Sequence, residues 1–148
     1  RCSNLIIFHK KYREVSIDLM FDLLPEFDGE QAGIILFIND DNYIKFVREM
    51  VNGKQAIVLA KEINGIPSAE LILPCESSST KLHLKMQKES ITLSWNFKGE
   101  RAFQSRKVTN WFRNYSEFQI GLLVHGDNSQ NQVEFSSLII DGRNQPLY

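Results

Sequence analysis

Polar and apolar residues alternate along most of this chain, and turn-forming residues interrupt the alternation at short intervals. In the segment Ile91–Phe97, Ile, Leu, Trp and Phe occupy every second position. Such a period of two places successive side chains on opposite faces of a β-strand, one buried and one wet. The pattern therefore predicts an all-β protein built from antiparallel sheets.

The interruptions contain the residues that tight turns need. The run Asn39 to Asn42 divides one long apolar stretch, and the pair Asn52-Gly53 divides it again. Asn-Gly is a strong hairpin signal because both positions accept a positive φ, so residues 32–60 are expected to form a three-stranded meander. The same reasoning predicts strands at 15–22, 71–73, 82–87, 91–97, 118–124 and 133–140, and one helical turn at Thr109–Tyr115 capped by Asn110.

About ten strands joined by Gly, Asn, Asp and Ser turns indicate a β-sandwich or barrel. The length of 148 residues suits a single domain, 1–148. With 17 Lys plus Arg against 18 Asp plus Glu and no basic run, the sequence lacks the basic face of a nucleic-acid binder. Its longest apolar run, Gly33–Ile38, is far too short to span a membrane.

The cysteines give an indication of the compartment. Cys2 and Cys75 are the two cysteines, and two isolated thiols in a reducing compartment are favoured over a disulfide. No charged-then-apolar signal segment opens the sequence, although residue 1 is Arg rather than Met, which weakens this evidence. A cytoplasmic location is slightly favoured, and secretion is the alternative.

The sequence contains no recognisable catalytic motif. Acid–base hydrolysis on a β-sandwich needs two carboxylates about 5–10 Å apart in one cleft, and no strand carries the alternating acids that would supply them. Glu49 with Glu134 is the pair that would remain for an unrecognised glycoside hydrolase. No nucleophile elbow, glycine-rich phosphate loop or spaced histidine pair is present. A binding or accessory domain is therefore favoured over an enzyme.

One weak metal candidate is Asp141, which directly follows the last predicted strand. Calcium binds carboxylate oxygens of this kind, so structural calcium is an option. A solvated Asp141-Gly142 turn explains the same residues equally well. No other cofactor is expected.

Aromatic residues provide the best candidates for ligand binding. Trp111 and Tyr115 lie close together in one long connection, and Tyr43 begins a strand directly after a polar turn. Sugars lay their C–H faces on aromatic rings while polar groups bind the hydroxyls, and Arg48 could supply such hydrogen bonds from a wet sheet face. The alternative, which we favour for the cluster at 111–115, is that its rings close one end of the core.

Several segments resemble a known family: EQAGIILFINDDNYIKF, VNGK, ITLSWNF and FQIGLLVHGDNSQNQVEFSSLII. They are similar to the concanavalin A-like domain at the C-terminus of family 43 glycoside hydrolases, the β-xylosidases and α-arabinofuranosidases, and to related stand-alone domains. The resemblance covers roughly residues 15–141. It implies a jelly-roll β-sandwich of two antiparallel sheets. Family domains usually have a further segment before the first strand expected here. Three alternatives follow: the segment is missing and the N-terminal part is incomplete, an upstream domain supplies it, or residues 1–14 replace it.

The resemblance also implies a function without chemistry of its own. The hydrolytic carboxylates of the xylosidases lie in a separate catalytic domain, so this chain is expected to recognise carbohydrate of the xylan or arabinan type or to pack on a partner enzyme domain. The alternatives are a protein-interaction or regulatory domain and the glycoside hydrolase considered above. Exposed strand edges offer a route to homo-oligomers.

Overall fold

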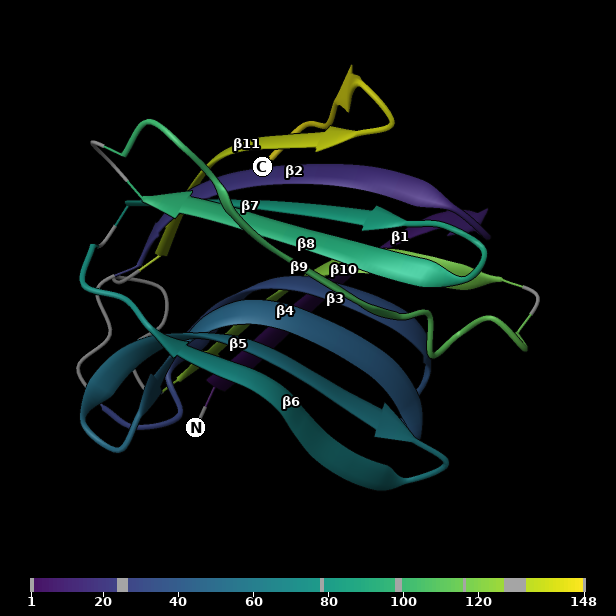
Figure 1. Ribbon diagram of the computed structural model, residues 1–148, viewed down its shortest axis with the longest axis horizontal. Helices are drawn as coiled ribbons and strands as arrows, with labels where there is room; N and C mark the ends of the chain where they lie inside the picture. The colour runs from purple at the N-terminus through teal and green to yellow at the C-terminus, as the bar shows by residue number, and fades with distance from the viewer. Residues whose placement is uncertain are drawn as a thin grey trace. The chain divides into compact units, whose positions relative to one another are not determined.

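The computed structural model consists of two antiparallel sheets of six strands each (Figure 1). It describes residues 2–23, 27–77, 79–97, 100–115, 117–126 and 133–147. Within these ranges no residue is helical, which confirms the all-β prediction. No helix in the described ranges is long and apolar enough to cross a membrane.

The first sheet has the strand order β1-β10-β3-β4-β5-β6. The neighbours from β10 to β6 pair in antiparallel fashion, and three of these pairs are consecutive hairpins. The bounds of the strands are β1 Cys2–Tyr12, β3 Gln31–Asn39, β4 Asn42–Val51, β5 Lys54–Ile63, β6 Ile66–Pro74 and β10 Phe118–Gly126.

The second sheet has the strand order β12-β11-β2-β7-β8-β9. It joins segments that are distant in sequence, because β2 pairs with β7 across an intervening run that belongs to the first sheet. The bounds of the strands are β2 Val15–Leu23, β7 Ser79–Met86, β8 Ser90–Phe97, β9 Gln104–Thr109, β11 Val133–Ile140 and β12 Arg143–Asn144.

The predicted meander at 32–60 is confirmed by the hairpins of the first sheet. Asn52 and Gly53 both have positive φ, 50° and 76°, as a two-residue hairpin turn requires. Asn39 and Asn42 face each other across the β3–β4 turn, where Asn42 Nδ2 donates to Asn39 Oδ1 over 3.0 Å. The polar interruptions of the apolar run are therefore turns between neighbouring strands.

Each sheet has one face on which buried side chains line up across the strands. In the second sheet the cross-strand register aligns Leu19, Leu82 and Trp95, all at most 2% exposed. In the first sheet it aligns Ile34 and Phe46 in the same way. Rows of this kind follow directly from period-two alternation, because directly opposed residues share a face.

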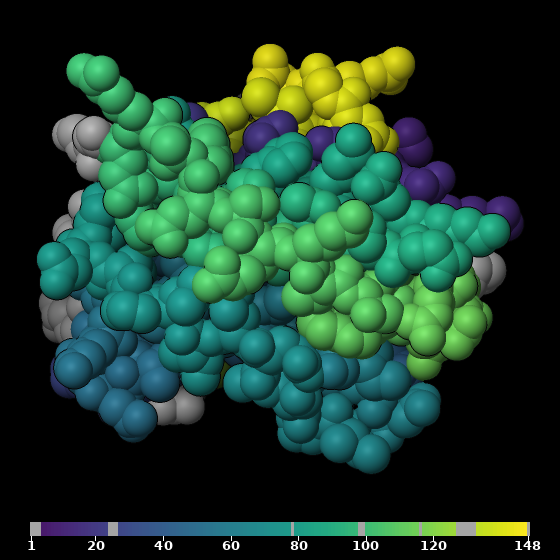
Figure 2. All heavy atoms as spheres, viewed as in Figure 1, coloured from purple at the N-terminus to yellow at the C-terminus, as the bar shows by residue number. Residues whose placement is uncertain are grey.

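Three strands were not predicted. β1 and β9 lie at sheet edges, and β12 is only two residues long. β9 is exposed along almost its whole length, so its sequence carries no alternation to reveal it. In Figure 2 the green atoms of β9 and of the turn that follows it lie at the surface on the viewed side.

The helical turn predicted at Thr109–Tyr115 is wrong. Residues 111–114 form hydrogen-bonded turns, with Arg113 N donating to Asn110 O and Tyr115 N donating to Phe112 O. Asn110 does act as a cap, because its Oδ1 accepts from Phe112 N at 2.8 Å. The connections at 98–99 and 127–132 lie outside the described residues, as does the Cys2 side chain. Cys75 is a free, buried thiol.

Truncation of Trp95 tests the buried face of the second sheet. We expect Trp95→Ala to lower the free energy of unfolding by about 3–5 kcal/mol, because it removes a large buried ring and leaves a cavity. Urea denaturation followed by circular dichroism measures the loss. Lys107→Ala, on exposed β9, is the control and should change stability by less than about 0.5 kcal/mol. Similar losses in both variants would contradict the assignment.

Candidate functional site

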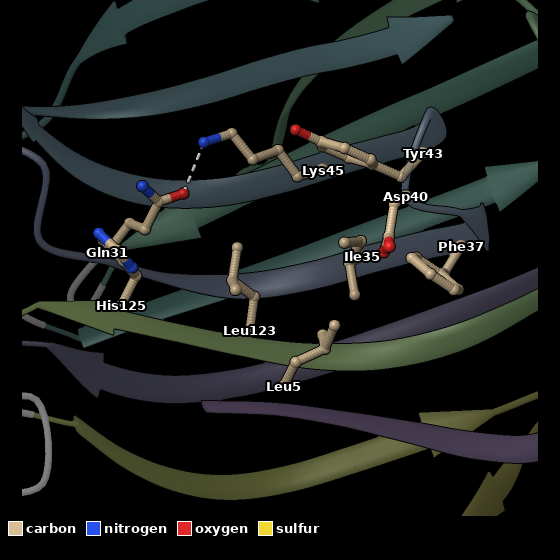
Figure 3. Close-up of a pocket in the computed structure, with 9 residues that line it drawn as sticks. All are labelled: Leu5, Gln31, Ile35, Phe37, Asp40, Tyr43, Lys45, Leu123 and His125. Carbon is tan, nitrogen blue, oxygen red and sulfur yellow. Dashed lines mark hydrogen bonds between the residues drawn. The ribbon is translucent and has the colours of Figure 1, made fainter. Parts of the chain in front are cut away.

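The first sheet carries a hollow of about 290 Å³ on the face opposite its main buried rows. Strands β1, β10, β3 and β4 and the turn between β3 and β4 contribute the side chains, which Figure 3 draws as sticks. The lining residues are Leu5, Gln31, Ile35, Phe37, Asp40, Tyr43, Lys45, Leu123 and His125.

The cross-strand register explains why these residues meet. Ile35 is opposite Lys45, Phe37 is opposite Tyr43, and Gln31 is opposite His125. Figure 3 shows the result: Gln31 and His125 lie at one end of the hollow, and Phe37 and Tyr43 lie at the other. Residues two apart on a strand share a face, so one register fixes the whole set.

Two glycines leave space on this face of the sheet, because they have no side chains. Gly33 is opposite Leu123, and Gly121 is opposite Ile35, so small residues alternate with the side chains of the floor. Neither glycine has room for a side chain. A Cβ on Gly33 would lie 2.4 Å from Phe46 O, and one on Gly121 would lie 2.6 Å from Ile6 O. The missing side chains of Gly33 and Gly121 thus account both for the close approach of the strands and for the depth of the hollow.

One end of the hollow holds an oriented polar network. Lys45 Nζ donates to Gln31 Oε1 at 2.6 Å and lies 3.5 Å from Glu49 Oε1. Gln31 is only 8% exposed, and its Nε2 donates to Gly29 O at 3.1 Å. Lys45 is therefore held in place by groups on both β3 and β4.

The other end is formed by Tyr43 and the turn that precedes it. The Tyr43 hydroxyl donates to Glu62 Oε1 at 3.4 Å, across the β4–β5 pair. Burial raises the pKa of Tyr43 above 10.0, and the negative charge of Glu62 and its hydrogen bond raise it further. The neighbouring turn is fixed by Asn42, whose Oδ1 accepts from Asn64 N at 2.9 Å. Tyr43 therefore stays protonated over a wide pH range and can donate a hydrogen bond.

Arg48 does not lie in this hollow, although it is on the same strand as Tyr43. The two residues are five positions apart, so their side chains point to opposite faces of β4. Arg48 is fully buried, in a row with Ala32 and Ile57. The expectation that Arg48 supplies hydrogen bonds from a wet face is therefore wrong.

The surroundings of Arg48 include the buried thiol of Cys75. Burial raises the pKa of the Cys75 thiol, and both the positive charge of Arg48 and a hydrogen bond with it act in the opposite direction. Arg48 thus belongs to the internal packing of the first sheet.

Trp111 and Tyr115 lie in the second compact unit of the chain and contribute nothing to the lining of the hollow. Phe112, between them in sequence, is 3% exposed and contacts Tyr115 edge-on, with ring centroids 5.6 Å apart. Phe112 therefore packs as a core residue, as the alternative reading of this cluster expected, whereas Trp111 and Tyr115 are only half-buried.

Asp141 forms a turn between β11 and β12. Its φ is 49°, its Oδ1 accepts from Ser16 N at 2.9 Å, and its own N donates to Ser16 O at 2.8 Å. These contacts give Asp141 a structural role in attaching the C-terminal hairpin to β2. Within the described ranges, no group of three or more His, Cys, Asp or Glu is placed to hold a metal ion. Calcium at Asp141 stays a prediction.

Tyr43 was predicted from the sequence as a ligand-binding residue, whereas the other residues that line the hollow were not. Lys45 could have been predicted, because it is two residues from Tyr43 on one predicted strand and therefore shares its face. The Asn39–Asn42 turn sets the register with the preceding strand, so the partners of both residues could have been predicted as well. Leu5 and Leu123 could not be found in this way, because β1 was not predicted and the pairing of β10 with β3 joins distant segments.

Comparison with known families identifies the fold. Residues 3–134 match the model of the beta xylosidase C-terminal concanavalin A-like domain. The chain belongs to this family. Membership confirms the predicted concanavalin A-like β-sandwich of two antiparallel sheets. Among curated proteins, no sequence matches the chain.

Several solved structures share this fold. The chain is similar to xylan beta-1,4-xylosidase from Bacillus halodurans C-125, with a TM-score of 0.72 and 13% identity over 86% of this chain and 27% of that one. It is also similar to the GH43 BlXynB protein from Bacillus licheniformis, with a TM-score of 0.72 and 16% identity over 89% of this chain and 28% of that one. The chain thus spans little more than a quarter of either protein.

A shorter relative matches along most of its own length. Carbohydrate binding module CBM66 from Bacillus subtilis is 14% identical, with a TM-score of 0.62, over 93% of this chain and 81% of that one. At such identities these likenesses concern the fold alone.

The pKa of Tyr43 gives a direct test of the geometry at its end of the hollow. We expect Glu62→Gln to lower this pKa, because the carboxylate that opposes ionisation of the phenol is removed, while burial keeps it above 10.0. Alkaline titration followed by NMR of the tyrosine ring measures it. A raised folded-state pKa adds stability that is present below the unfolded-state value and is lost as pH rises through the folded-state value. Glu62→Gln should therefore flatten this alkaline loss.

Glu49→Gln is the matched control for this titration. Glu49 is on the same strand and the same face as Tyr43 but six residues away, roughly 20 Å along the strand. Charges at that separation are largely screened in physiological salt. An equal effect of both variants would contradict the Tyr43–Glu62 contact.

Proposed function

We propose that this chain is a non-catalytic recognition domain that binds carbohydrate in the hollow of the first sheet. The observation that carries the proposal is the arrangement of that hollow. Two half-buried rings, Phe37 and Tyr43, are cross-strand partners on one face of the sheet, in the same hollow as the apolar residues Ile35 and Leu123. The same hollow contains the carboxylate of Asp40 and, toward its other end, the hydrogen-bonded pair Lys45 and Gln31.

This combination suits the chemistry of a sugar. The C–H face of a pyranose or furanose ring gains from contact with rigid, partly dry aromatic and aliphatic surface. Sugar hydroxyls can donate to the carboxylate of Asp40 and accept from Lys45. Because Gln31 and Glu49 already restrain the lysine, less side-chain entropy is lost when it binds a ligand.

The relatives support a carbohydrate context. The family takes its name from the C-terminal domain of beta xylosidase, one fold neighbour is a xylan beta-1,4-xylosidase, and another is a carbohydrate binding module. We therefore propose oligosaccharides of the xylan or arabinan type as the first ligands to test. A role beside a partner enzyme domain is compatible with this proposal, since the same hollow could hold substrate for a catalytic neighbour.

A second candidate function is protein interaction or homo-oligomerisation through sheet edges. Ile66 is 71% exposed and Ile72 is 51% exposed on edge strand β6, and Ile6 is 60% exposed on edge strand β1. Edge strands with exposed apolar side chains can pair with another chain. This candidate predicts a concentration-dependent increase in mass and no dependence on Tyr43.

Substitution of Tyr43 tests the carbohydrate proposal. We expect the wild type to bind xylo- or arabino-oligosaccharides in isothermal titration calorimetry, and we expect Tyr43→Ala to weaken binding about fivefold, because a ring contact contributes on the order of 1 kcal/mol. Tyr43→Phe keeps the ring and should retain most of the affinity. Thermal melting of each variant separates lost binding from lost folding.

Phe103→Ala is the matched control, because Phe103 is an exposed ring, 51% accessible, that does not line the hollow. Loss of affinity in both alanine variants, or binding that does not depend on Tyr43, would contradict the site. Release of reducing sugar during incubation with the oligosaccharides would contradict the non-catalytic role.

A further inference from the structure

A second hollow, of about 410 Å³, lies in the compact unit that contains the second sheet. Three turns form it: the one between β1 and β2, the one between β7 and β8, and the one that follows β9. It is lined by Arg13, Glu14, Lys88, Asn110, Phe112, Arg113 and Tyr115.

Asn110 holds two of these turns together. It is 3% exposed, and its Nδ2 donates to Gln87 O at 2.8 Å and to Lys88 O at 3.2 Å. Its Oδ1 accepts from Phe112 N at 2.8 Å, and its backbone O accepts from Arg113 N at 3.2 Å. The backbone positions of Lys88 and Arg113 are therefore fixed relative to each other by one buried amide, so this part of the hollow is preorganised.

The charge of this hollow departs from that of the whole chain. The formal net charge of the sequence is −1, but the lining has three cations, Arg13, Lys88 and Arg113, and one carboxylate, Glu14. All four are exposed, and within the described ranges none of the three cations forms an ion pair with a carboxylate. Their charge is therefore available to a ligand.

The hollow also contains a ring with a fixed orientation. Tyr115 is half-buried, and its ring meets that of the buried Phe112 edge-on, at 5.6 Å and an interplanar angle of 69°. Its backbone N donates to Phe112 O at 2.9 Å, which fixes the start of the side chain. A rigid aromatic surface therefore lies among the positive charges.

We propose that this hollow binds an organic anion that combines a carboxylate with an apolar ring face, a sugar acid such as glucuronate. The guanidinium groups of Arg13 and Arg113 match the planar carboxylate, because an arginine fork can donate two parallel hydrogen bonds to it. The C–H face of the sugar ring packs on Tyr115. Exposed ion pairs contribute little by themselves, so the ring contact is what distinguishes this ligand from a simple anion.

The proposal is independent of neutral-sugar binding in the first sheet. The two hollows share no lining residue, and each lies within its own compact unit. Tyr43→Ala should therefore leave glucuronate binding unchanged, and loss of the arginines should leave binding of neutral oligosaccharides unchanged.

NMR titration of the intact chain tests the proposal, with glucuronate, glucose and inorganic phosphate as separate probes. We expect glucuronate to shift the amide signals of Lys88 and of residues 110–115 in a saturable way, with an affinity at least about tenfold higher than that of glucose or phosphate. Raising the salt concentration from 0.05 to about 0.5 M should weaken binding severalfold, because the ionic contribution is screened. The double variant Arg13→Ala/Arg113→Ala should weaken it about tenfold.

The control is Arg101→Ala/Arg106→Ala, which removes the same charge from exposed positions outside the hollow. This variant should keep the wild-type affinity, and an equal loss in both double variants would reduce the effect to net charge and overturn the proposal. Phosphate binding as tightly as glucuronate would show that the ring contributes nothing and would overturn it as well. So would the absence of a saturable shift in the folded wild type.

Discussion

The pairing of β3 with β4, which keeps one register from Gln31 to Phe37, is the constraint on which the first sheet depends. It places Ile34 and Phe46 on a fully buried face, and it places Phe37 and Tyr43 together on the other. A slip by one residue would exchange the two faces of a strand and expose the apolar row. The energy of burying that row thus also sets the geometry of the hollow, and the turn at 39–42 that starts β4 takes part in both.

Close packing around glycine connects the same two properties. Gly33 and Gly121 allow neighbouring backbones to approach, since a Cβ at either position would lie within 2.4–2.6 Å of a carbonyl oxygen. Both also leave out side chains from the face that carries the hollow. Any larger residue there would have to push strands apart before it could fill the hollow, so packing and binding surface are not independent in this sheet.

Much of the architecture follows from the sequence, because alternation and Asn-Gly turns act locally. The strands that escaped prediction lack that local signal: β9 is exposed on both faces, and β1 joins its sheet only through a long-range pairing with β10. The prediction for Arg48 was wrong because a charged residue was assigned to a wet face. Arg48 is five residues from Tyr43 on the same strand, so its side chain lies on the other face of β4, which is buried. The two hollows were not predicted for a different reason: each is formed by strands or turns that only the tertiary pairing brings together.

The two hollows differ in the physics that each would use to hold a ligand. In the first sheet, Lys45 is engaged by Gln31 and Glu49, so its charge is partly compensated before any ligand arrives. Such a surface favours neutral molecules with many hydroxyls. In the second unit, Arg13 and Arg113 carry no such compensation within the described ranges, and the ring of Tyr115 lies in the same hollow. An uncompensated cation attracts an anion over roughly a Debye length, about 8 Å, so selectivity there must come from the ring at contact distance.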